Sequence, residues 1–331
     1  MNKNFDEIIQ KAQRLLKENQ SEWVEQYKLY AEEMTANAAF ISEKREKFRE
    51  WAPLYFYINT SKAKNAKSKL TLDVRYMGQN IAALTCDKNG VVTISTTGYE
   101  TTNLRDFDCK IKLENTGWKD SVAFRRFFRE REQTRNEGKK ANAEHKIESM
   151  LLTEFSKKSG EKRLRGIQPV KFAGKIRFSM PTVLSASDHN ELKIPESRKG
   201  GGVDILARVG SGRNASLCII ELKDENNSTE PPELALQQAV EYTVFIRELL
   251  RSEAGSFWWK LFGFSKDIPD KLTLYASCAM PARESGKDDE SFRGTRFNID
   301  GDIIECHYIY YTLSEAKTSL QSIKTSLPQM P

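Results

Sequence analysis

Apolar residues recur at three- and four-residue steps near the start of the chain, and this spacing predicts helix. Phe5, Ile8 and Ala12 begin the pattern, and Trp23 continues it. Residues at these steps lie on one helical face, which packs against a core or against another helix. We therefore expect residues 1–60 to form an N-terminal helical region that packs into a core. The same region is a candidate contact for a protein partner.

Strand-like segments follow this helical region. TLDVRYM, IAALTC and VVTIST have strand composition, and Asn89-Gly90 separates the last two. An Asn-Gly pair favours a tight hairpin in which both residues take positive φ. We expect an antiparallel meander from about 70 to 114. Helical spacing returns in KDSVAFRRFFREREQ, so residues 66–135 are expected to form a small antiparallel β module plus a basic helix.

Helices and strands alternate over the rest of the chain, residues 137–331. Helical spacing marks ANAEHKIESMLLTEFSKK and residues 233–251. This alternation predicts an α/β fold with a mixed sheet flanked by helices. The aromatic run FWWKLFGF is expected to pack as a corner of the core. Strand-like segments lie at 168–180, 203–209, 217–223, 271–279 and 303–312, and we expect the last of these to be the final strand.

Composition and charge narrow the class of protein. The formal net charge is +6, but residues 119–177 hold seventeen basic and eight acidic residues, an excess that can attract nucleic acid. Five scattered cysteines without a Cys-x-x-Cys pair argue against a disulfide framework or a structural zinc site. No apolar run approaches the roughly 20 residues of a membrane span, and the first residues lack a secretory signal. We expect a cytoplasmic protein without membrane contact.

One constellation of charged residues points to chemistry. Asp204 begins an apolar strand, and Glu221 and Lys223 lie on the next strand, after a glycine-containing loop. Side chains alternate along a strand, so Glu221 and Lys223 share one face while Leu222 points to the other. A hairpin of the two strands would bring Asp204 close to Glu221. Two carboxylates and the Leu222 carbonyl form an oxygen site of the kind Mg²⁺ prefers, with Mn²⁺ as a substitute, and Lys223 can orient a water.

Asp204 followed by Glu-Leu-Lys at 221–223 resembles the signature of the PD-(D/E)XK nuclease superfamily. This superfamily includes restriction endonucleases, repair nucleases and junction resolvases. The resemblance covers residues 140–280 and implies a restriction-endonuclease-like mixed sheet and hydrolysis of phosphodiester bonds. Val203 stands where the family name has proline. The glycines at 200–202 are expected to allow a close backbone approach, for example to the substrate.

The resemblance adds three further site positions. The family carries a metal-site glutamate on an upstream helix, which implies Glu144, with Glu148 as the alternative. Gln238 and Tyr242 match the Gln-x-x-x-Tyr element of the RecB-like branch. Their spacing puts both on one helical face, where they could hold Lys223 or a phosphate of the substrate.

The leading hypothesis is a Mg²⁺-dependent endonuclease that acts on DNA, with RNA as an open alternative. Analogy with relatives suggests a role in prokaryotic restriction or phage defence. Symmetric cleavage of a duplex usually requires two active sites, which leaves a homodimer as an open expectation. The alternative hypothesis is a catalytically inactive nucleic-acid-binding or assembly module on the same fold. The residues expected to contact the nucleic-acid backbone are Arg125, Arg126, Arg129, Arg131, Arg198 and Lys199.

Overall fold

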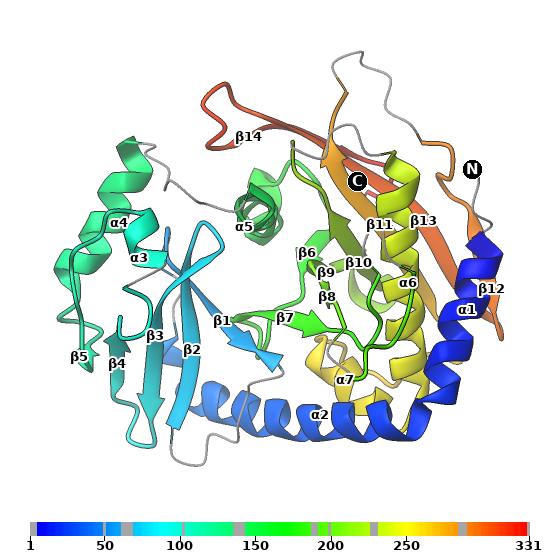
Figure 1. Cartoon of the computed structure of the whole chain (residues 1–331), viewed down its shortest axis with the longest axis horizontal. Coiled ribbons are helices and arrows are strands. Elements are labelled where there is room, and N and C mark those ends of the chain that lie inside the picture. Colours follow the sequence, from blue (N-terminus) through cyan, green and yellow to red (C-terminus); the bar gives the residue numbers. More distant parts are fainter. Residues whose placement is uncertain are drawn as a thin grey trace.

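A computed structural model of the chain describes residues 5–48, 51–60, 69–100, 103–134, 143–186, 191–197, 200–225, 231–283 and 290–329. Its fold is α/β, with two mixed sheets and helices packed around them (Figure 1). The helices in these ranges are α1 (Phe5–Glu18), α2 (Gln20–Glu43), α3 (Asn103–Asp106), α4 (Val122–Thr134), α5 (Ala143–Ser156), α6 (Pro232–Arg251) and α7 (Gly255–Leu261).

The first sheet has seven strands in the order β5-β4-β3-β2-β1-β7-β8. The predicted meander is confirmed, because β2, β3 and β4 pair antiparallel in sequence order. The sheet extends further than the meander, since β1 pairs in parallel with β7 from much later in the chain. These strands are β1 (Tyr55–Asn59), β2 (Lys69–Tyr76), β3 (Gln79–Asp87), β4 (Val92–Ser95), β5 (Thr116–Gly117), β7 (Arg177–Pro181) and β8 (Gly202–Val203).

The hairpin between β3 and β4 differs in detail from the prediction. Gly90 has a φ of 77°, whereas Asn89 is not among the residues with positive φ. The Asp87 carboxylate accepts hydrogen bonds from the backbone amides of Asn89 and Val91, at 2.9 and 2.8 Å. An aspartate that satisfies the turn amides allows a turn with a single left-handed residue, so the expected pair of positive φ angles is wrong here.

The second sheet also has seven strands and includes the two strands on which the sequence places the candidate site. Its order is β12-β13-β11-β10-β9-β6, and β14 pairs with β13. β9 and β10 are antiparallel, while β10, β11 and β13 run parallel. The expectation that residues 303–312 form the last strand is wrong, because β14 follows them. These strands are β6 (Ile167–Pro169), β9 (Ile205–Val209), β10 (Ser216–Leu222), β11 (Thr273–Pro281), β12 (Arg296–Ile299), β13 (Asp302–Leu313) and β14 (Leu320–Thr325).

The two faces of β10 pack against different helices. Leu217 and Ile219 belong to a core shared with α1 and α6, whereas Ile220 and Leu222 belong to a core shared with Ile147 and other residues of α5. This alternation is the one expected for a strand buried on both faces. It places position 221, two residues after Ile219, on the α6 side of the sheet.

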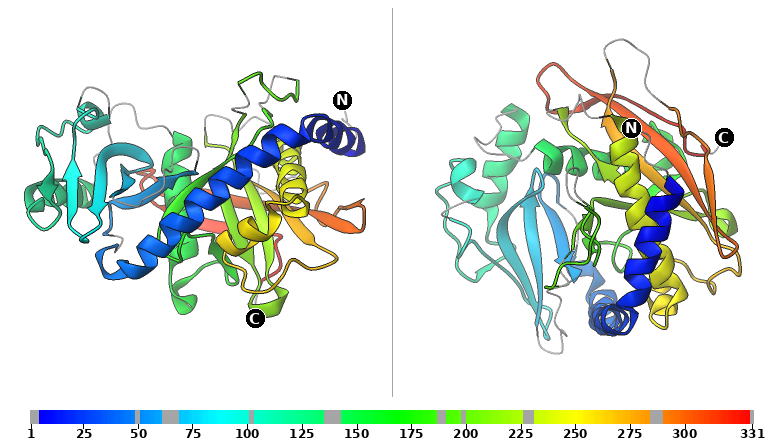
Figure 2. Two further views of the ribbon diagram at one scale, coloured as in Figure 1. Left: turned by 90° about the horizontal axis from the view of Figure 1, so that it is seen from below. Right: turned by 45° about the vertical axis from the view of Figure 1, so that its right-hand side comes forward.

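Helix α2 is shared by both halves of the molecule. Trp23 and Tyr27 pack into the core of the second sheet, while Met34 and Ile41 pack into the core of the first. Figure 1 and the left view of Figure 2 show this long helix running along both sheets. The prediction of N-terminal helix is confirmed over α1 and α2, and their apolar stripe is core in both halves of the molecule. It is wrong for the end of the region 1–60, because Tyr55–Asn59 form β1, which pairs with β2 and β7.

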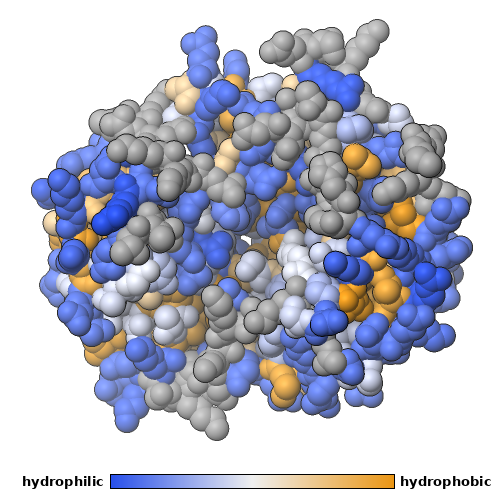
Figure 3. Space-filling view, in the orientation of Figure 1, coloured by the Kyte–Doolittle hydropathy of each residue, from blue (hydrophilic) through white to orange (hydrophobic). Residues whose placement is uncertain are grey.

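The aromatic run after α6 packs as a corner of the core, as expected. Trp258 and Phe262 are fully buried, and the Trp258 indole donates a 3.0 Å hydrogen bond to the Tyr27 carbonyl of α2. None of the helices in the described ranges combines the length and the apolar composition that a membrane span requires. The face seen in Figure 3 is predominantly hydrophilic, with scattered apolar positions.

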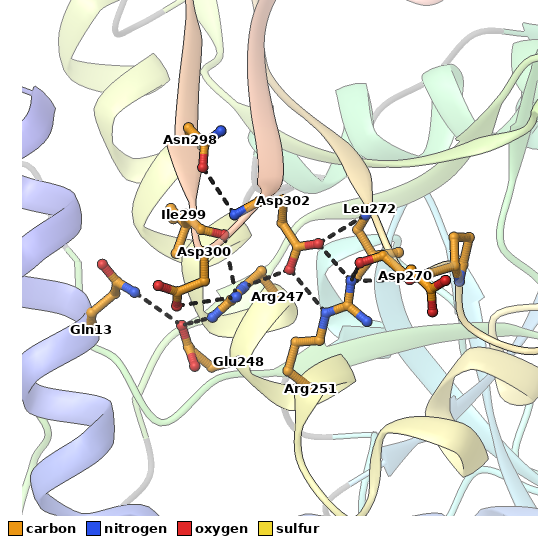
Figure 4. A network of polar contacts seen from close by, with 12 residues as sticks. Gln13, Arg247, Glu248, Arg251, Asp270, Leu272, Asn298, Ile299, Asp300 and Asp302 are labelled. Carbon is orange, nitrogen blue, oxygen red and sulfur yellow. Dashed lines mark hydrogen bonds and ion pairs between the residues drawn. The ribbon is translucent and has the colours of Figure 1, made fainter.

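A buried carboxylate anchors the C-terminal end of α6. Asp302, 1% exposed, accepts hydrogen bonds from Nε of Arg247 at 2.8 Å and Nε of Arg251 at 2.9 Å. Its second oxygen accepts from the Leu272 amide at 2.9 Å. Figure 4 shows how these groups converge between α6 and the hairpin of β12 and β13. Hydrogen bonds to the charged form outweigh burial here and lower the pKa of Asp302.

Candidate active site

The hairpin of β9 and β10 brings Asp204 to the end of β10. Ile205 pairs with Ile220 across the hairpin, so Asp204 lies beside the last residues of β10. The Leu222 amide donates a 2.8 Å hydrogen bond to an Asp204 carboxylate oxygen. The sequence predicted this juxtaposition, because the glycine-containing loop at 210–212 joins the two strands as a hairpin.

Glu221 and Lys223 share one side of the strand, as alternation requires. Each is only 5% exposed, and Lys223 Nζ lies 3.5 Å from a Glu221 carboxylate oxygen. The backbone of Lys223 is held on both sides: its amide donates to the Ala279 carbonyl at 2.9 Å, and its carbonyl accepts from the Tyr311 hydroxyl at 2.7 Å. The ammonium group is therefore presented from a fixed backbone.

The predicted residues of α6 lie on the same side as Lys223. Lys223 Nζ donates a 3.2 Å hydrogen bond to the Gln238 side-chain oxygen. The amide nitrogen of Gln238 in turn lies 3.4 Å from the Tyr242 hydroxyl. Gln238 and Tyr242 were expected to hold either Lys223 or a phosphate of the substrate. The contacts run from Tyr242 through Gln238 to Lys223, so these two residues hold the lysine.

Both candidate glutamates of α5 act on the carboxylates of the hairpin. The negative charges of Glu148 and Glu144 each raise the pKa of Asp204, with Glu148 the stronger, while Glu144 also raises the pKa of Glu221. Both side chains are half-buried. Glu148 has a second partner, since His145 Nδ1 lies 3.5 Å from its carboxylate. The choice between Glu144 and Glu148 as the upstream ligand therefore stays open.

Burial and like charge dominate the electrostatics of this cluster. Burial raises the pKa of Asp204 to about 7, against the opposing effect of the Leu222 hydrogen bond. Burial also raises the pKa of Glu221 well above its usual range, and the neighbouring Asp204 raises it further, while Lys223 opposes both. Lys223 offsets only part of these effects, since both pKa values remain raised, so an added positive charge beside Asp204 and Glu221 would be favourable.

The glycines before Asp204 serve a purpose that differs from the prediction. A Cβ atom on Gly200 would lie 2.3 Å from the Leu184 carbonyl oxygen, and one on Gly201 would lie 2.1 Å from the Tyr242 hydroxyl. The close backbone approach is thus made to the protein itself, at Leu184 and Tyr242. The glycines allow this segment to pass close to Tyr242, and the Tyr242 hydroxyl in turn contacts Gln238 in the site.

Residues of the first sheet also lie near Glu148 of α5, and sequence reasoning missed them. Burial raises the pKa of Tyr57 to about 12, and the charge of Glu148 contributes to the shift. Arg177 donates a 3.3 Å hydrogen bond to the Tyr57 hydroxyl, and Arg75 lies over the Tyr57 ring at 4.1 Å. No local sequence signal could have found them, because the parallel pairing of β1 with β7 joins segments 120 residues apart.

The basic helix α4 packs its arginines partly against aromatic rings. Arg125 and Arg129 lie over the Trp51 ring, at 4.7 and 4.2 Å from its centre. Arg131 is half-buried near Phe107, whereas Arg126 is exposed. The other two predicted backbone contacts, Arg198 and Lys199, lie outside the described residues.

The donor chemistry of the cluster fits a hard divalent cation, but the carboxylates are not gathered into a ready-made ligand set. No group of three or more His, Cys, Asp or Glu side chains within the described ranges is arranged to hold a metal. One Asp204 oxygen faces the Leu222 amide and one Glu221 oxygen faces Lys223. Buried carboxylates with raised pKa values are nevertheless the donors that Mg²⁺ takes.

Comparisons of the chain with protein-family models, with curated proteins and with solved structures found no match. The resemblance to the PD-(D/E)XK nucleases therefore rests on the motif residues and on the arrangement described above.

Proposed function

We propose that the chain is a metal-dependent nuclease whose second sheet, with α5 and α6, is a restriction-endonuclease-like core. The observation that carries the proposal is the convergence of Asp204, Glu221 and Lys223 at one end of β10, with Lys223 bound to Gln238 at 3.2 Å. A salt bridge between Lys223 and Glu221 would need only one carboxylate. Asp204 adds a second buried carboxylate on the other strand of the hairpin, and a buried charge without a counter-charge is costly.

Lys223 is the residue that we assign to the attacking water. Its ammonium group is held beside the two carboxylates by Glu221 and Gln238, and an ammonium group fixed there can orient a water oxygen. The water oxygen forms a bond to phosphorus while the bond to the 3′ oxygen breaks. The products are a 5′-phosphate and a 3′-hydroxyl, and the proton lost by water is balanced by the one that the leaving oxygen takes up.

Asp204, Glu221, the Leu222 carbonyl and one of the α5 glutamates would hold the cation. When bound, Mg²⁺ polarises the phosphoryl oxygens and lowers the pKa of bound water. Its charge would also offset the repulsion that raises the pKa values of Asp204 and Glu221.

The test is cleavage of supercoiled plasmid and of single- and double-stranded DNA and RNA oligonucleotides, with Mg²⁺, with Mn²⁺ and with EDTA. We expect metal-dependent nicking, and a loss of more than about a hundredfold in Asp204→Asn. Glu114→Gln removes an exposed carboxylate in the first sheet's β4–β5 connection and should leave the rate unchanged. Cleavage by Asp204→Asn at the rate of the unaltered chain would reject the proposal.

A second function is favoured by one observation: the two hairpin carboxylates, Asp204 and Glu221, both have partners within the protein. If Asp204 and Glu221 only bind the Leu222 amide and Lys223, the same core serves as a nucleic-acid-binding or assembly module. Binding of DNA without cleavage of any substrate, under every metal condition, would favour this module over the nuclease.

A further inference from the structure

The turn between β2 and β3 lies directly against the first turn of α5. Met77 and Gly78 form this two-residue turn, with φ angles of 47° and 76°. A Cβ atom on Gly78 would lie 2.5 Å from the carbonyl oxygen and 2.8 Å from the carbonyl carbon of His145. The contact is made by backbone on both sides, so no flexible side chain could move out of the way. Glycine is therefore needed both for the turn and for the close approach of the helix.

The two candidate glutamates of α5 lie beside this contact. Glu144 directly precedes His145, and Glu148 follows it by three residues, which is less than one helical turn. His145 Nδ1 also lies 3.5 Å from a Glu148 carboxylate oxygen. A displacement of the helix at His145 would therefore move both glutamates relative to Asp204 and Glu221.

Further groups of the first sheet brace this contact near Glu148. Burial raises the pKa of Tyr57 on β1, and the negative charge of Glu148 raises it further, so the two groups are near each other. Arg75 of β2 lies over the Tyr57 ring, 4.1 Å from its centre. The side-chain oxygen of Asn80 on β3 accepts a 2.8 Å hydrogen bond from Nε of Arg75. Side chains from three adjacent strands thus fix this end of the first sheet beside α5.

A different face of α5 packs against the second sheet. Ile147 and Leu151 belong to the core that contains Ile220 and Leu222 of β10, the strand of Glu221. The helix is thus held between the turn of the first sheet and the strand that carries the candidate site. Mg²⁺ requires oxygen ligands at about 2.0–2.1 Å in nearly octahedral geometry. A small shift of α5 should therefore weaken a cation site to which the helix contributes a ligand.

We propose that the turn of Met77 and Gly78 positions the α5 glutamates for cation binding, so that the first sheet is part of the scaffold of the active site. The inference rests on the proposed function. Gly78 has no side chain with which to bind a cation, so its role is that of a positioning residue. The first sheet is then required for cleavage, although every candidate cation ligand lies outside its strands.

The test compares Gly78→Ala with Gly98→Ala. Gly98 has a φ of 86°, close to that of Gly78, but no described atom beyond its chain neighbours lies within 4 Å of a Cβ placed there. Both variants carry similar backbone strain, and only Gly78→Ala presses on α5. Single-turnover cleavage at saturating DNA is measured as Mg²⁺ is varied. We expect Gly78→Ala to need about tenfold more Mg²⁺ for its half-maximal rate, and Gly98→Ala to need as much as the unaltered chain.

Calorimetric titration with Mn²⁺ alone, without DNA, gives a second readout that does not depend on cleavage. Gly78→Ala should bind Mn²⁺ about tenfold more weakly than Gly98→Ala does. A partly unfolded variant would instead show fewer binding sites and a smaller amplitude of cleavage, at an unchanged metal affinity. If melting shows that Gly78→Ala does not fold, Asn80→Ala replaces it. This variant removes the acceptor of Arg75 and should raise the Mg²⁺ requirement about threefold.

The outcomes separate this proposal from the nuclease proposal. Equal metal requirements in Gly78→Ala and Gly98→Ala, or an unchanged requirement in Asn80→Ala, overturn the positioning role, while cleavage by the unaltered chain leaves the nuclease standing. If the unaltered chain binds Mn²⁺ but cleaves nothing, the Mn²⁺ affinities alone decide the positioning role. If it cleaves but binds no Mn²⁺ without DNA, the Mg²⁺ dependence decides it. Absence of both cleavage and Mn²⁺ binding in the unaltered chain overturns both proposals.

Discussion

Gly201 and Tyr242 are in such close contact that a Cβ atom on Gly201 would lie 2.1 Å from the Tyr242 hydroxyl oxygen. Tyr242 is 3% exposed, so its rigid ring has little room to move aside. The hydroxyl contacts Gln238, and Gln238 accepts the hydrogen bond from Lys223. The backbone before Asp204 is thus joined mechanically to the lysine on the next strand.

Gly201→Ala should therefore disturb both stability and activity. Overpacking against a buried ring costs about 1–3 kcal/mol of unfolding free energy. Displacement of Tyr242 should also loosen Gln238 and reduce the cleavage rate. The measurements are denaturant unfolding and plasmid nicking.

Gly202→Ala is the matched control for this substitution. The nearest atom to a Cβ at Gly202 is the Met180 carbonyl oxygen at 3.6 Å, an ordinary contact. Its unfolding free energy should stay within about 0.5 kcal/mol of the unaltered chain. If Gly201→Ala proves as stable as Gly202→Ala, the contact with Tyr242 is not a constraint.

Metal-free stability should fall as pH rises from about 4 to about 7. Asp204 has a pKa of about 7 in the folded chain, above its value of about 3.9 when unfolded. The folded state therefore binds the proton more tightly, and its stability is greatest below the unfolded pKa and declines between pH 4 and 7. At roughly 1.4 kcal/mol per pH unit, the loss from Asp204 is on the order of 4 kcal/mol.

Guanidinium unfolding in EDTA at pH 5, 6.5 and 8 measures this dependence. Asp204→Asn keeps a side-chain acceptor for the Leu222 amide but cannot ionise, so its stability should decline less over the same range. Mg²⁺ should recover stability in the unaltered chain at pH 8 and have little effect on Asp204→Asn. Identical pH profiles for the two proteins would show that Asp204 is already ionised in the fold.

Substitutions along the contact chain should have graded effects on cleavage. Lys223→Met removes the group assigned to the water and should slow cleavage by about 10²–10⁴-fold. Gln238→Ala leaves the lysine mispositioned and should slow cleavage by about 10–100-fold. Tyr242→Phe removes one long hydrogen bond and should cost about threefold. The single-turnover rate at saturating DNA gives this order, and DNA affinity in EDTA should be unchanged in all three. An undiminished rate for Gln238→Ala would mean that Gln238 does not position the lysine.

The network at the end of α6 should contribute to stability and not to cleavage. Asp302→Ala leaves Arg247 and Arg251 without the buried carboxylate between them, and should cost about 3–5 kcal/mol of unfolding free energy. Asp300→Ala removes another partner of Arg247, but the Asp300 side chain is 79% exposed, so the cost should be below about 1 kcal/mol. Denaturant unfolding compares the two. If the two substitutions lower the unfolding free energy by similar amounts, the burial of Asp302 does not determine how much it contributes to stability.

Local patterns were sufficient to predict the centre of the candidate site. Strand alternation put Glu221 and Lys223 on one face. Gln238 and Tyr242 came from the resemblance to the RecB-like branch, and the helical repeat added that both share one face of α6, which contacts Lys223. The short loop between β9 and β10 made the approach of Asp204 to Glu221 predictable. Each of these inferences needs only neighbours within a few dozen residues.

Such local patterns could not predict contacts between segments that lie far apart in the sequence. The hydrogen bond of Arg177 to Tyr57, which lies near Glu148, depends on the parallel pairing of β1 with β7, and no spacing in either segment encodes this pairing. The role of Gly201 was misjudged for the same reason, because an absent side chain does not say which atom fills its place. The strand β14 was missed because its alternation is weak and mostly polar.

Helix α2 ties the candidate site to the rest of the molecule in a way that affects how the chain can be divided. The first half of α2 packs into the core of the second sheet, and its second half packs into the core of the first. A cut of the chain that separates the two sheets would therefore remove α2 from one of the two cores. The fragment without α2 could then not be expected to fold by itself. Heating or denaturant should melt the whole chain in a single cooperative step, with both sheets lost together.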